Sequence, residues 1–115
     1  MVEFETLEEC LKEMENRYNT EKVKIKLKKY EDPIQISFLD TKRDVLININ
    51  KDQGIEIKDK TKDEDAPVKI EFIEEQVMLD LFNKEIGGVK AYSAGKIKVV
   101  EGNVRKLMKL RTLMF

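Results

Sequence analysis

Hydrophobic positions near the start of the chain recur at intervals of three and four residues. The apolar positions are Phe4, Leu7, Leu11, Met14 and Tyr18, with charged residues between them. This spacing places the apolar side chains on one side of an α-helix of about four turns. Cys10 lies on the same side. We therefore predict an amphipathic helix here, with Cys10 as a small buried side chain.

The apolar period then changes to two, which is the spacing of a strand with one buried face. Alternating segments follow one another, with apolar members Val23, Ile25 and Leu27, then Ile34, Ile36 and Phe38, then Val45, Ile47 and Ile49, then Ile55 and Ile57, then Val68, Ile70 and Phe72, and finally Ile97 and Val99. Residues 51–54 read as a hairpin turn, in which Gly54 supplies a positive φ. Such alternation predicts an antiparallel sheet that is covered on one side only.

The opposite face of that sheet is expected to be rich in lysine. Its members would be Lys24, Lys26, Lys28, Lys69, Lys96 and Lys98, with Glu56 and Glu71 among them. A platform for RNA would also need exposed aromatic side chains for base stacking. Every aromatic residue of these strands falls in the buried register, so we interpret the face as solvated and expect no nucleic-acid partner.

Two further helices are predicted, at residues 74–86 and 104–115. The first begins with Glu74 and Glu75, which suit the positive end of a helix dipole, and Gly87-Gly88 can end it. Asn103 is a suitable N-cap for the second. Both helices carry more apolar surface than packing on one sheet requires, so each is expected to face a second layer, a cavity or a partner.

Arg111 projects into the apolar face of the last helix. One interpretation is that it extends past the final turn or caps the C-terminal carbonyl groups. The other is that it lies at the edge of an apolar pocket and binds the acidic head of a lipid-like ligand. Met78, Met108 and Met114 lie on these two helices and fit an adaptable pocket, although a face that bears methionine is more often ordinary core.

Composition excludes several kinds of chemistry. The chain has no histidine and one cysteine, so it cannot form a Ser-His or Cys-His pair or a zinc cluster. Gly95-Lys96 is not a phosphate-binding loop, because Lys90 and Ile97 occupy the positions that need glycine and a hydroxyl. Its 22 basic and 23 acidic residues nearly cancel, which favours no anionic partner. We expect a cytoplasmic protein without catalytic residues, metal or cofactor.

The order of the elements predicts one α+β domain spanning residues 1–115. The sheet would have five to six antiparallel strands, with the helices packed on one face. No apolar run is long enough to cross a bilayer. Contact with a membrane surface would therefore be transient at most.

The C-terminal part of the chain resembles the sterol carrier protein-2 domain family. The similarity rests on a run of short motifs, which are Ala91-Tyr92, Ser93-Ala94, Gly95-Lys96-Ile97-Lys98-Val99, Gly102-Asn103 and Leu107-Met108-Lys109-Leu110. The preceding hairpin, strand and acidic-started helix follow the family's order, so the resemblance covers roughly residues 44 to 115. The residue pattern gives six strands where the family has five, so residues 23–29 or 34–39 are an addition or are misread.

The resemblance implies a five-stranded sheet, a hydrophobic tunnel under the helices, and non-enzymatic binding of fatty acyl, phospholipid or isoprenoid molecules. The residues expected to contact the ligand are Phe72, Met78, Leu81, Phe82, Tyr92, Leu107, Met108, Arg111 and Phe115. The alternative is an interaction or dimerisation module, a homodimer included, that uses the same apolar helices without a bound lipid.

Overall fold

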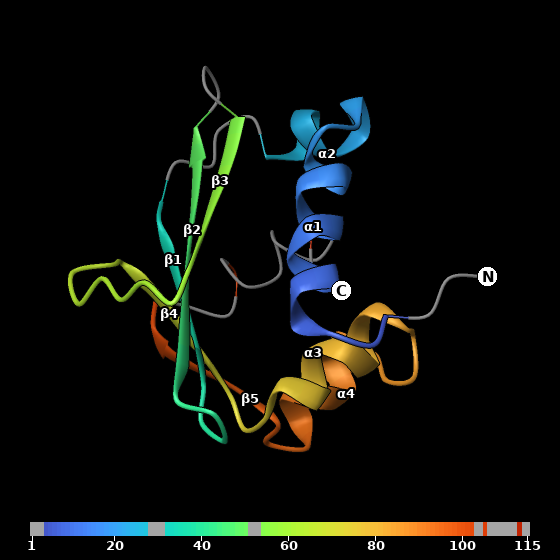
Figure 1. The fold of residues 1–115 in the computed structure, drawn as a ribbon, viewed down its shortest axis with the longest axis vertical. Helices are drawn as coiled ribbons and strands as arrows, with labels where there is room; N and C mark the ends of the chain where they lie inside the picture. Colours follow the sequence, from blue (N-terminus) through green and yellow to red (C-terminus); the bar gives the residue numbers. More distant parts are fainter. Residues whose placement is uncertain (1–3, 28–31, 51–53, 103–104, 106–112, 114–115) are drawn as a thin grey trace.

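The computed structural model describes residues 4–27, 32–50, 54–102, 105 and 113, which form two layers. Figure 1 shows the sheet edge-on, with helices α1 to α4 all on the same side of it. The predicted α+β class, with helices packed on one face of a sheet, is confirmed.

The sheet has five strands within the described residues, in the spatial order β3-β2-β1-β4-β5. Their bounds are β1 (Ile34–Phe38), β2 (Arg43–Asn50), β3 (Gly54–Asp59), β4 (Val68–Phe72) and β5 (Ile97–Glu101). Three neighbouring pairs are antiparallel as predicted, but β1 and β4 are parallel. Alternation identifies the buried face of a strand and not the direction of its neighbour, so the sequence pattern did not reveal this pair.

Helix α1 (Leu7–Tyr18) is the predicted amphipathic helix. It begins with a capping box, in which the Thr6 hydroxyl accepts from the Glu9 amide at 3.3 Å and the Glu9 carboxylate accepts from the Thr6 amide at 3.1 Å. The predicted apolar face is buried from Leu7 to Tyr18, Cys10 included, whereas Phe4, predicted as its first member, precedes the helix and is half-buried. Burial raises the pKa of the Cys10 thiol to about 12.

The predicted strand at residues 23–29 is wrong. The chain instead forms a short helix, α2 (Glu21–Lys26), that follows α1 directly. Val23 and Leu27 are buried, whereas Ile25 is 70% exposed. A spacing of four places Val23 and Leu27 on one side of a helix and Ile25 on the other, so the helical period accounts for this burial and the strand period does not.

Helix α3 (Glu75–Phe82) is shorter than predicted, and a fourth helix that the sequence did not reveal, α4 (Gly88–Ser93), comes after it. Asn83 caps the C-terminus of α3, and Gly87 is the N-cap of α4 rather than the end of the preceding helix. At the end of the chain, Arg105 and Leu113 are helical and Leu113 is fully buried. The other residues of the predicted helix at 104–115, and its predicted cap Asn103, lie outside the described residues.

The face of the sheet away from the helices is partly covered, which corrects the prediction of a fully solvated face. The segment between β3 and β4 lies over it, and Gln35 is only 2% exposed there. The Gln35 amide donates to the carbonyl oxygens of Val45 at 3.2 Å and Thr61 at 3.0 Å, and its oxygen accepts from the Asp63 amide. Leu46, in register with Gln35, is also buried. The Gln35 side chain therefore holds the segment between β3 and β4 against the sheet.

The predicted lysine face is also smaller than expected. Lys24 and Lys26 belong to α2 rather than to a strand, and Lys28 lies outside the described residues. Lys98 is exposed on β5, while Lys69 is half-buried on β4. At the hairpin, Gly54 has the expected positive φ of 89° and opens β3, and residues 51–53 lie outside the described part of the chain.

Candidate functional site

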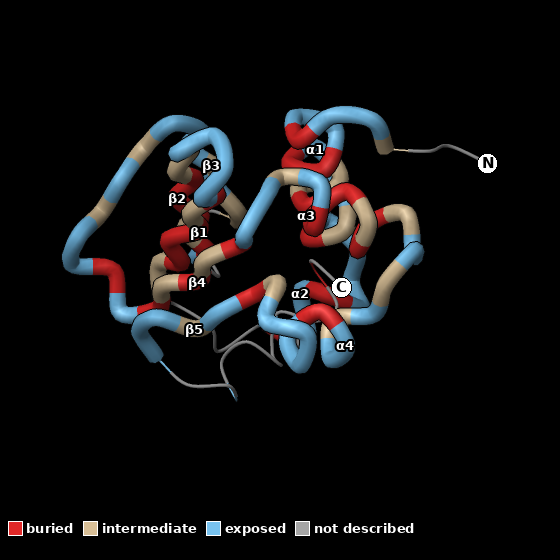
Figure 2. Tube along the Cα trace, turned by 90° about the horizontal axis from the view of Figure 1, so that it is seen from below, coloured by how far each residue is buried: buried red, intermediate tan, exposed pale blue. Residues whose placement is uncertain are grey.

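The apolar layer between sheet and helices brings together four of the predicted ligand-contacting residues. Phe72 points inward from β4, and Met78, Leu81 and Phe82 point inward from α3; all four are buried in one continuous cluster. Figure 2 shows buried segments on the strands and on the helices that face them. The two periods, two in β4 and about 3.6 in α3, direct these side chains into the same layer.

Two aromatic pairs lie in or beside this layer. Phe72 contacts Phe38 of β1 with ring centroids 5.3 Å apart and planes tilted by 44°. Phe82 meets Phe4 edge-to-face, with centroids 5.6 Å apart and an interplanar angle of 78°. Both separations fall within the range of favourable aromatic contacts. The β1/β4 side and the α3 side of the layer therefore each contain an aromatic pair.

Arg17 of α1 is a cation at the border of this layer. Its guanidinium carbon lies 4.6 Å from the centroid of the Phe82 ring, which is within reach of a cation–π interaction. Its Nη1 atom donates to the carbonyl oxygen of Leu113 at 3.3 Å, and its Nε atom lies 3.8 Å from Glu13. The side chain is 26% exposed, so it contacts both the layer and water.

The sequence interpretation did not single out Arg17, although the signal was present. Three residues after Met14 and one before Tyr18, Arg17 falls at the edge of the apolar stripe of α1, close to Cys10 on a helical wheel. The cation that was singled out, Arg111, lies outside the described residues, as do Leu107, Met108 and Phe115.

Tyr92 is placed differently from the other predicted residues. It lies on α4 with 40% of its surface exposed, whereas its neighbour Ala91 is fully buried. Helix α4 therefore directs Ala91 toward the core and leaves the tyrosine partly in water. A contact between Tyr92 and a ligand remains a prediction.

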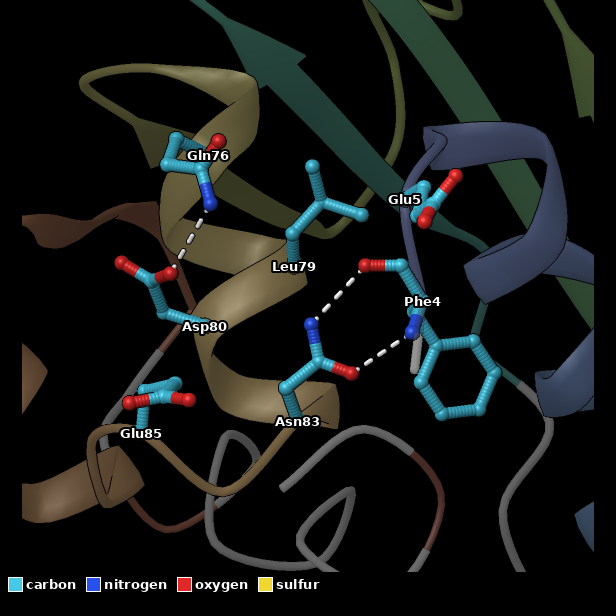
Figure 3. Close-up of a pocket in the computed structure, with 7 residues that line it drawn as sticks. All are labelled: Phe4, Glu5, Gln76, Leu79, Asp80, Asn83 and Glu85. Carbon is cyan, nitrogen blue, oxygen red and sulfur yellow. Dashed lines mark hydrogen bonds between the residues drawn. The ribbon is translucent and has the colours of Figure 1, made fainter. Parts of the chain in front are cut away.

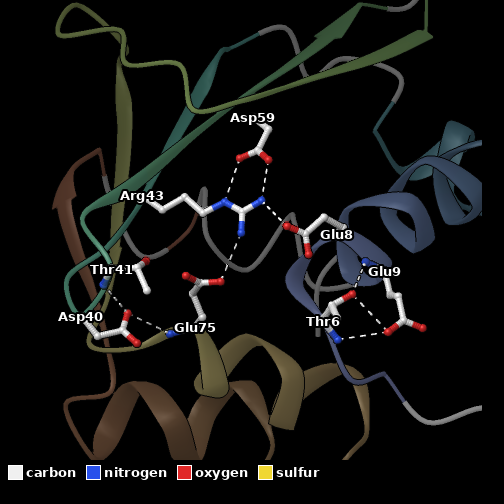
Figure 4. A network of polar contacts seen from close by, with 8 residues as sticks. All are labelled: Thr6, Glu8, Glu9, Asp40, Thr41, Arg43, Asp59 and Glu75. Atoms are coloured by element: carbon white, nitrogen blue, oxygen red, sulfur yellow. Dashed lines mark hydrogen bonds and ion pairs between the residues drawn. The ribbon is translucent and has the colours of Figure 1, made fainter.

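A second cluster of polar residues joins the helices to the sheet at the start of β2 (Figure 4). Arg43 forms a bidentate contact with Asp59 of β3, with Nε to Oδ1 at 2.9 Å and Nη2 to Oδ2 at 2.5 Å. The same guanidinium donates to Glu8 of α1 at 2.7 Å and to Glu75 of α3 at 3.3 Å. One cation thus connects three elements besides its own.

Hydrogen bonding to Arg43 shifts the pKa values of two carboxylates in this cluster. It lowers the pKa of Glu8 and the pKa of Asp59, and the bond to Asp59 raises the pKa of Arg43 itself. The Arg43 side chain is only 14% exposed. Arg43, Glu8, Asp59 and Glu75, here called the Arg43 clasp, therefore form an ion-pair network that joins the helices to the sheet. Each of these four residues already has a partner.

A groove with a volume of about 440 Å³ lies on the outer side of α3 (Figure 3). It is lined by Phe4, Glu5, Gln76, Leu79, Asp80, Asn83 and Glu85. None of the predicted ligand-contacting residues lines it, and most of its lining is polar. The groove is thus distinct from the apolar layer, although Phe4 and Leu79 contribute to both.

Among the residues that the structure describes, no group of three or more histidine, cysteine, aspartate or glutamate residues is arranged to hold a metal ion. No helix in the described part of the chain has the length and hydrophobicity to cross a membrane.

Comparison with known proteins identifies the class to which this chain belongs. The sequence matches the SCP-2 sterol transfer family over residues 11–115. The chain therefore belongs to this family, as its C-terminal motifs indicated. A search of curated proteins found no match.

Solved structures show the same fold at low sequence identity. A ubiquinone synthesis protein, UbiJ-SCP2, is similar with a TM-score of 0.67 and 10% identity over 84% of this chain and 81% of its own. Sterol carrier protein 2 is similar with a TM-score of 0.66 and 11% identity, over 91% of this chain and 87% of that one. At these identities the likeness concerns the fold alone.

The same fold also occurs inside a much larger enzyme. The stereoselective inverting sec-alkylsulfatase Pisa1 from Pseudomonas sp. is similar with a TM-score of 0.69 and 16% identity. The match covers 88% of this chain but only 15% of the sulfatase. The present chain thus corresponds to a small part of that protein's length.

Proposed function

We propose that this protein binds a hydrophobic, lipid-like molecule between its sheet and its helices, without catalysing a reaction on it. Membership of the SCP-2 sterol transfer family supports lipid binding or transfer in general. We place the binding site in the apolar layer between sheet and helices because Phe72, Met78, Leu81 and Phe82 converge there in one buried cluster. An acyl chain that loses about 300 Å² of apolar surface there gains roughly 7 kcal/mol before the cost of association.

The proposed ligand class is fatty acyl, phospholipid or isoprenoid, held in a tunnel under the helices. The family is named for sterol transfer, and one structural relative is named a ubiquinone synthesis protein. Sterols and ubiquinone both have a long apolar body, which such a tunnel would accept. The proposed contacts are the four buried residues above, with Tyr92, Leu107, Met108 and Phe115. Arg111 is proposed to lie near an acidic head group, and Arg17 is a second cation beside the layer.

The proposal of a non-enzymatic role rests on the side chains that the chain contains. It has no histidine, so the residue that most often transfers protons at neutral pH is missing. Its one cysteine is buried, with a raised pKa that disfavours the reactive thiolate. Apolar burial alone is sufficient to bind a lipid, and it requires none of these groups.

Native mass spectrometry of gently purified protein tests the proposed function. We expect an added mass in the range of a lipid, which organic extraction releases and identifies. A fluorescent fatty acid should bind the delipidated protein and be displaced by the extracted lipid. A clean apo mass together with no binding of the fluorescent fatty acid would contradict the proposal.

A further inference from the structure

One side chain holds the backbone of Phe4 against the end of α3. The Phe4 amide donates to Asn83 Oδ1 at 2.7 Å, and Asn83 Nδ2 donates to the Phe4 carbonyl oxygen at 2.8 Å. Figure 3 shows both bonds, with the Asn83 amide group facing the N-terminal segment. A single asparagine side chain thus satisfies both main-chain groups of a residue 79 positions away.

The ring of Phe4 covers a residue of the apolar layer. It meets Phe82 edge-to-face at 5.6 Å, and Arg17 contacts the same ring of Phe82 at 4.6 Å. Phe4 is half-buried, whereas Phe82 is only 3% exposed. At this corner of the molecule, Phe4 and Arg17 therefore lie between Phe82 and water.

The segment is anchored separately at its other end. One oxygen of the Glu9 carboxylate accepts from the amides of Glu5 and Thr6, both at 3.1 Å. The Thr6 bond belongs to the capping box of α1, and neither bond involves Asn83. Breaking the Asn83 bonds would therefore free Phe4 and leave α1 capped, which is a local opening that requires no global unfolding.

We propose that residues 4–6, here called the N-terminal strap, form a gate to the apolar layer, and that Asn83 is its latch. When Asn83 releases Phe4, the ring leaves Phe82, and a lipid passes in or out beside Phe82. This inference rests on the proposed function, because a gate requires a ligand in the layer. The strap precedes residues 11–115, so it lies outside the region that matches the family.

A gate changes rates and not affinity, which distinguishes it from a ligand-contacting residue. Opening of the strap precedes both association and dissociation, so a weaker latch accelerates both by the same factor. A residue that contacts the bound lipid would instead alter Kd. Loss of the hydrogen bond to the Phe4 carbonyl, with an oxygen placed against that carbonyl instead, is expected to raise both rates by about tenfold.

Stopped-flow measurement with a fluorescent fatty acid tests this inference. Asn83→Asp is nearly isosteric and keeps an acceptor for the Phe4 amide, but it places an oxygen against the Phe4 carbonyl. We expect both rates to rise with Kd unchanged. Phe4→Ala keeps the backbone contacts, removes the covering ring and should act in the same direction. Gln76→Ala is the control, because Gln76 lines the same groove and bonds Asp80 at 2.9 Å rather than Phe4.

Amide hydrogen exchange at Phe4 follows the strap without any ligand. Exchange should accelerate in Asn83→Asp while the thermal midpoint shows that the protein remains folded. Unchanged lipid rates in both Asn83→Asp and Phe4→Ala, with binding intact, would overturn the gate alone. Unchanged Phe4 exchange in Asn83→Asp would overturn the latch. If wild-type protein shows a clean apo mass and binds no fatty acid, the proposed function and the gate are both overturned.

Discussion

Gly95 shows how the surrounding structure determines what a residue does. It has a φ of 77° and directly follows the C-cap of α4. The Lys96 amide bonds the Ala91 carbonyl at 2.9 Å, and the Gly95 amide bonds that of Tyr92 at 3.1 Å. These two bonds are the closing pair of a Schellman motif. The glycine that superficially suggests a phosphate loop therefore ends a helix.

We predict that Gly95→Ala lowers the free energy of unfolding by about 1 kcal/mol. A Cβ at this position would meet no atom within 4 Å, so the loss would come from the left-handed backbone and not from a clash. Urea denaturation measures it. Unchanged stability in Gly95→Ala would contradict a left-handed conformation at this position.

Lys84 offers the matched contrast, because it takes the same conformation at the end of α3. Its φ is 60°, and the Glu85 amide bonds the Asp80 carbonyl at 2.8 Å in the same closing pattern. Here a side chain stands where glycine is preferred. Lys84→Gly should therefore raise the free energy of unfolding, by about 0.5 kcal/mol, since relief of the left-handed strain exceeds the added entropy of the unfolded chain.

At the same scale, the sequence predicted four of the side chains that meet in the apolar layer but not what borders it. Phe72 and Phe82 follow from local period, because each lies in register with other buried residues of its own element. The approach of Phe4 and Arg17 to Phe82 depends on how α1 and the segment before it pack against α3. No periodicity within one element contains that information.

At the scale of elements, α2 shows where the hydrophobic pattern fails to distinguish a helix from a strand. Val23 and Leu27 are four residues apart, and that spacing is compatible with both a strand and a helix. Only Ile25 distinguishes the two, and in the structure it is largely exposed. Lys24 and Lys26 between these positions and Glu21 before them favour helix, and a run this short leaves the period undetermined. Helix α4 was missed for a related reason, since its glycine-flanked sequence has one buried residue and no stripe.

At this scale we predict that the Arg43 clasp stabilises the packing of helices on the sheet. Arg43→Met leaves Glu8, Asp59 and Glu75 close together without their common cation. We expect the free energy of unfolding at pH 7 to fall by about 2 kcal/mol, as for loss of hydrogen bonds to charged groups. Lys58→Met is the control, because Lys58 and its partner Glu56 are both largely exposed and should contribute little.

The clasp also predicts a dependence of stability on pH. The folded pKa values of Glu8 and Asp59 lie below their ordinary values of 4.5 and 3.8, so these carboxylates favour the folded state at pH values above that range. This contribution is lost as the pH falls through the folded pKa values. Between about pH 5 and pH 3, stability should decline less steeply in Arg43→Met than in wild type. Parallel declines would show that Arg43 does not lower these pKa values.

For the molecule as a whole, the layered fold presents two competing requirements. The layer between sheet and helices must be apolar for the chain to fold, and the proposed ligand needs room in that same layer. On the far face of the sheet, Gln35 holds the segment between β3 and β4. The larger apolar layer lies on the other face, between the sheet and the helices. Stability and binding are therefore expected to respond differently to added volume at different buried positions.

Adding volume at Met78 tests whether the layer accommodates a ligand. If Met78 borders the ligand, the ring of Met78→Trp takes up space that the lipid would fill. Lipid affinity should then fall at least about tenfold, while the free energy of unfolding of the apo protein changes by less than about 1.5 kcal/mol. Ile36→Trp is the control, because Ile36 is equally buried on the central strand and is not a proposed ligand contact. There, overpacking should cost about 1–3 kcal/mol. Equal destabilisation in both variants, with lipid binding retained by folded Met78→Trp, would place the ligand elsewhere.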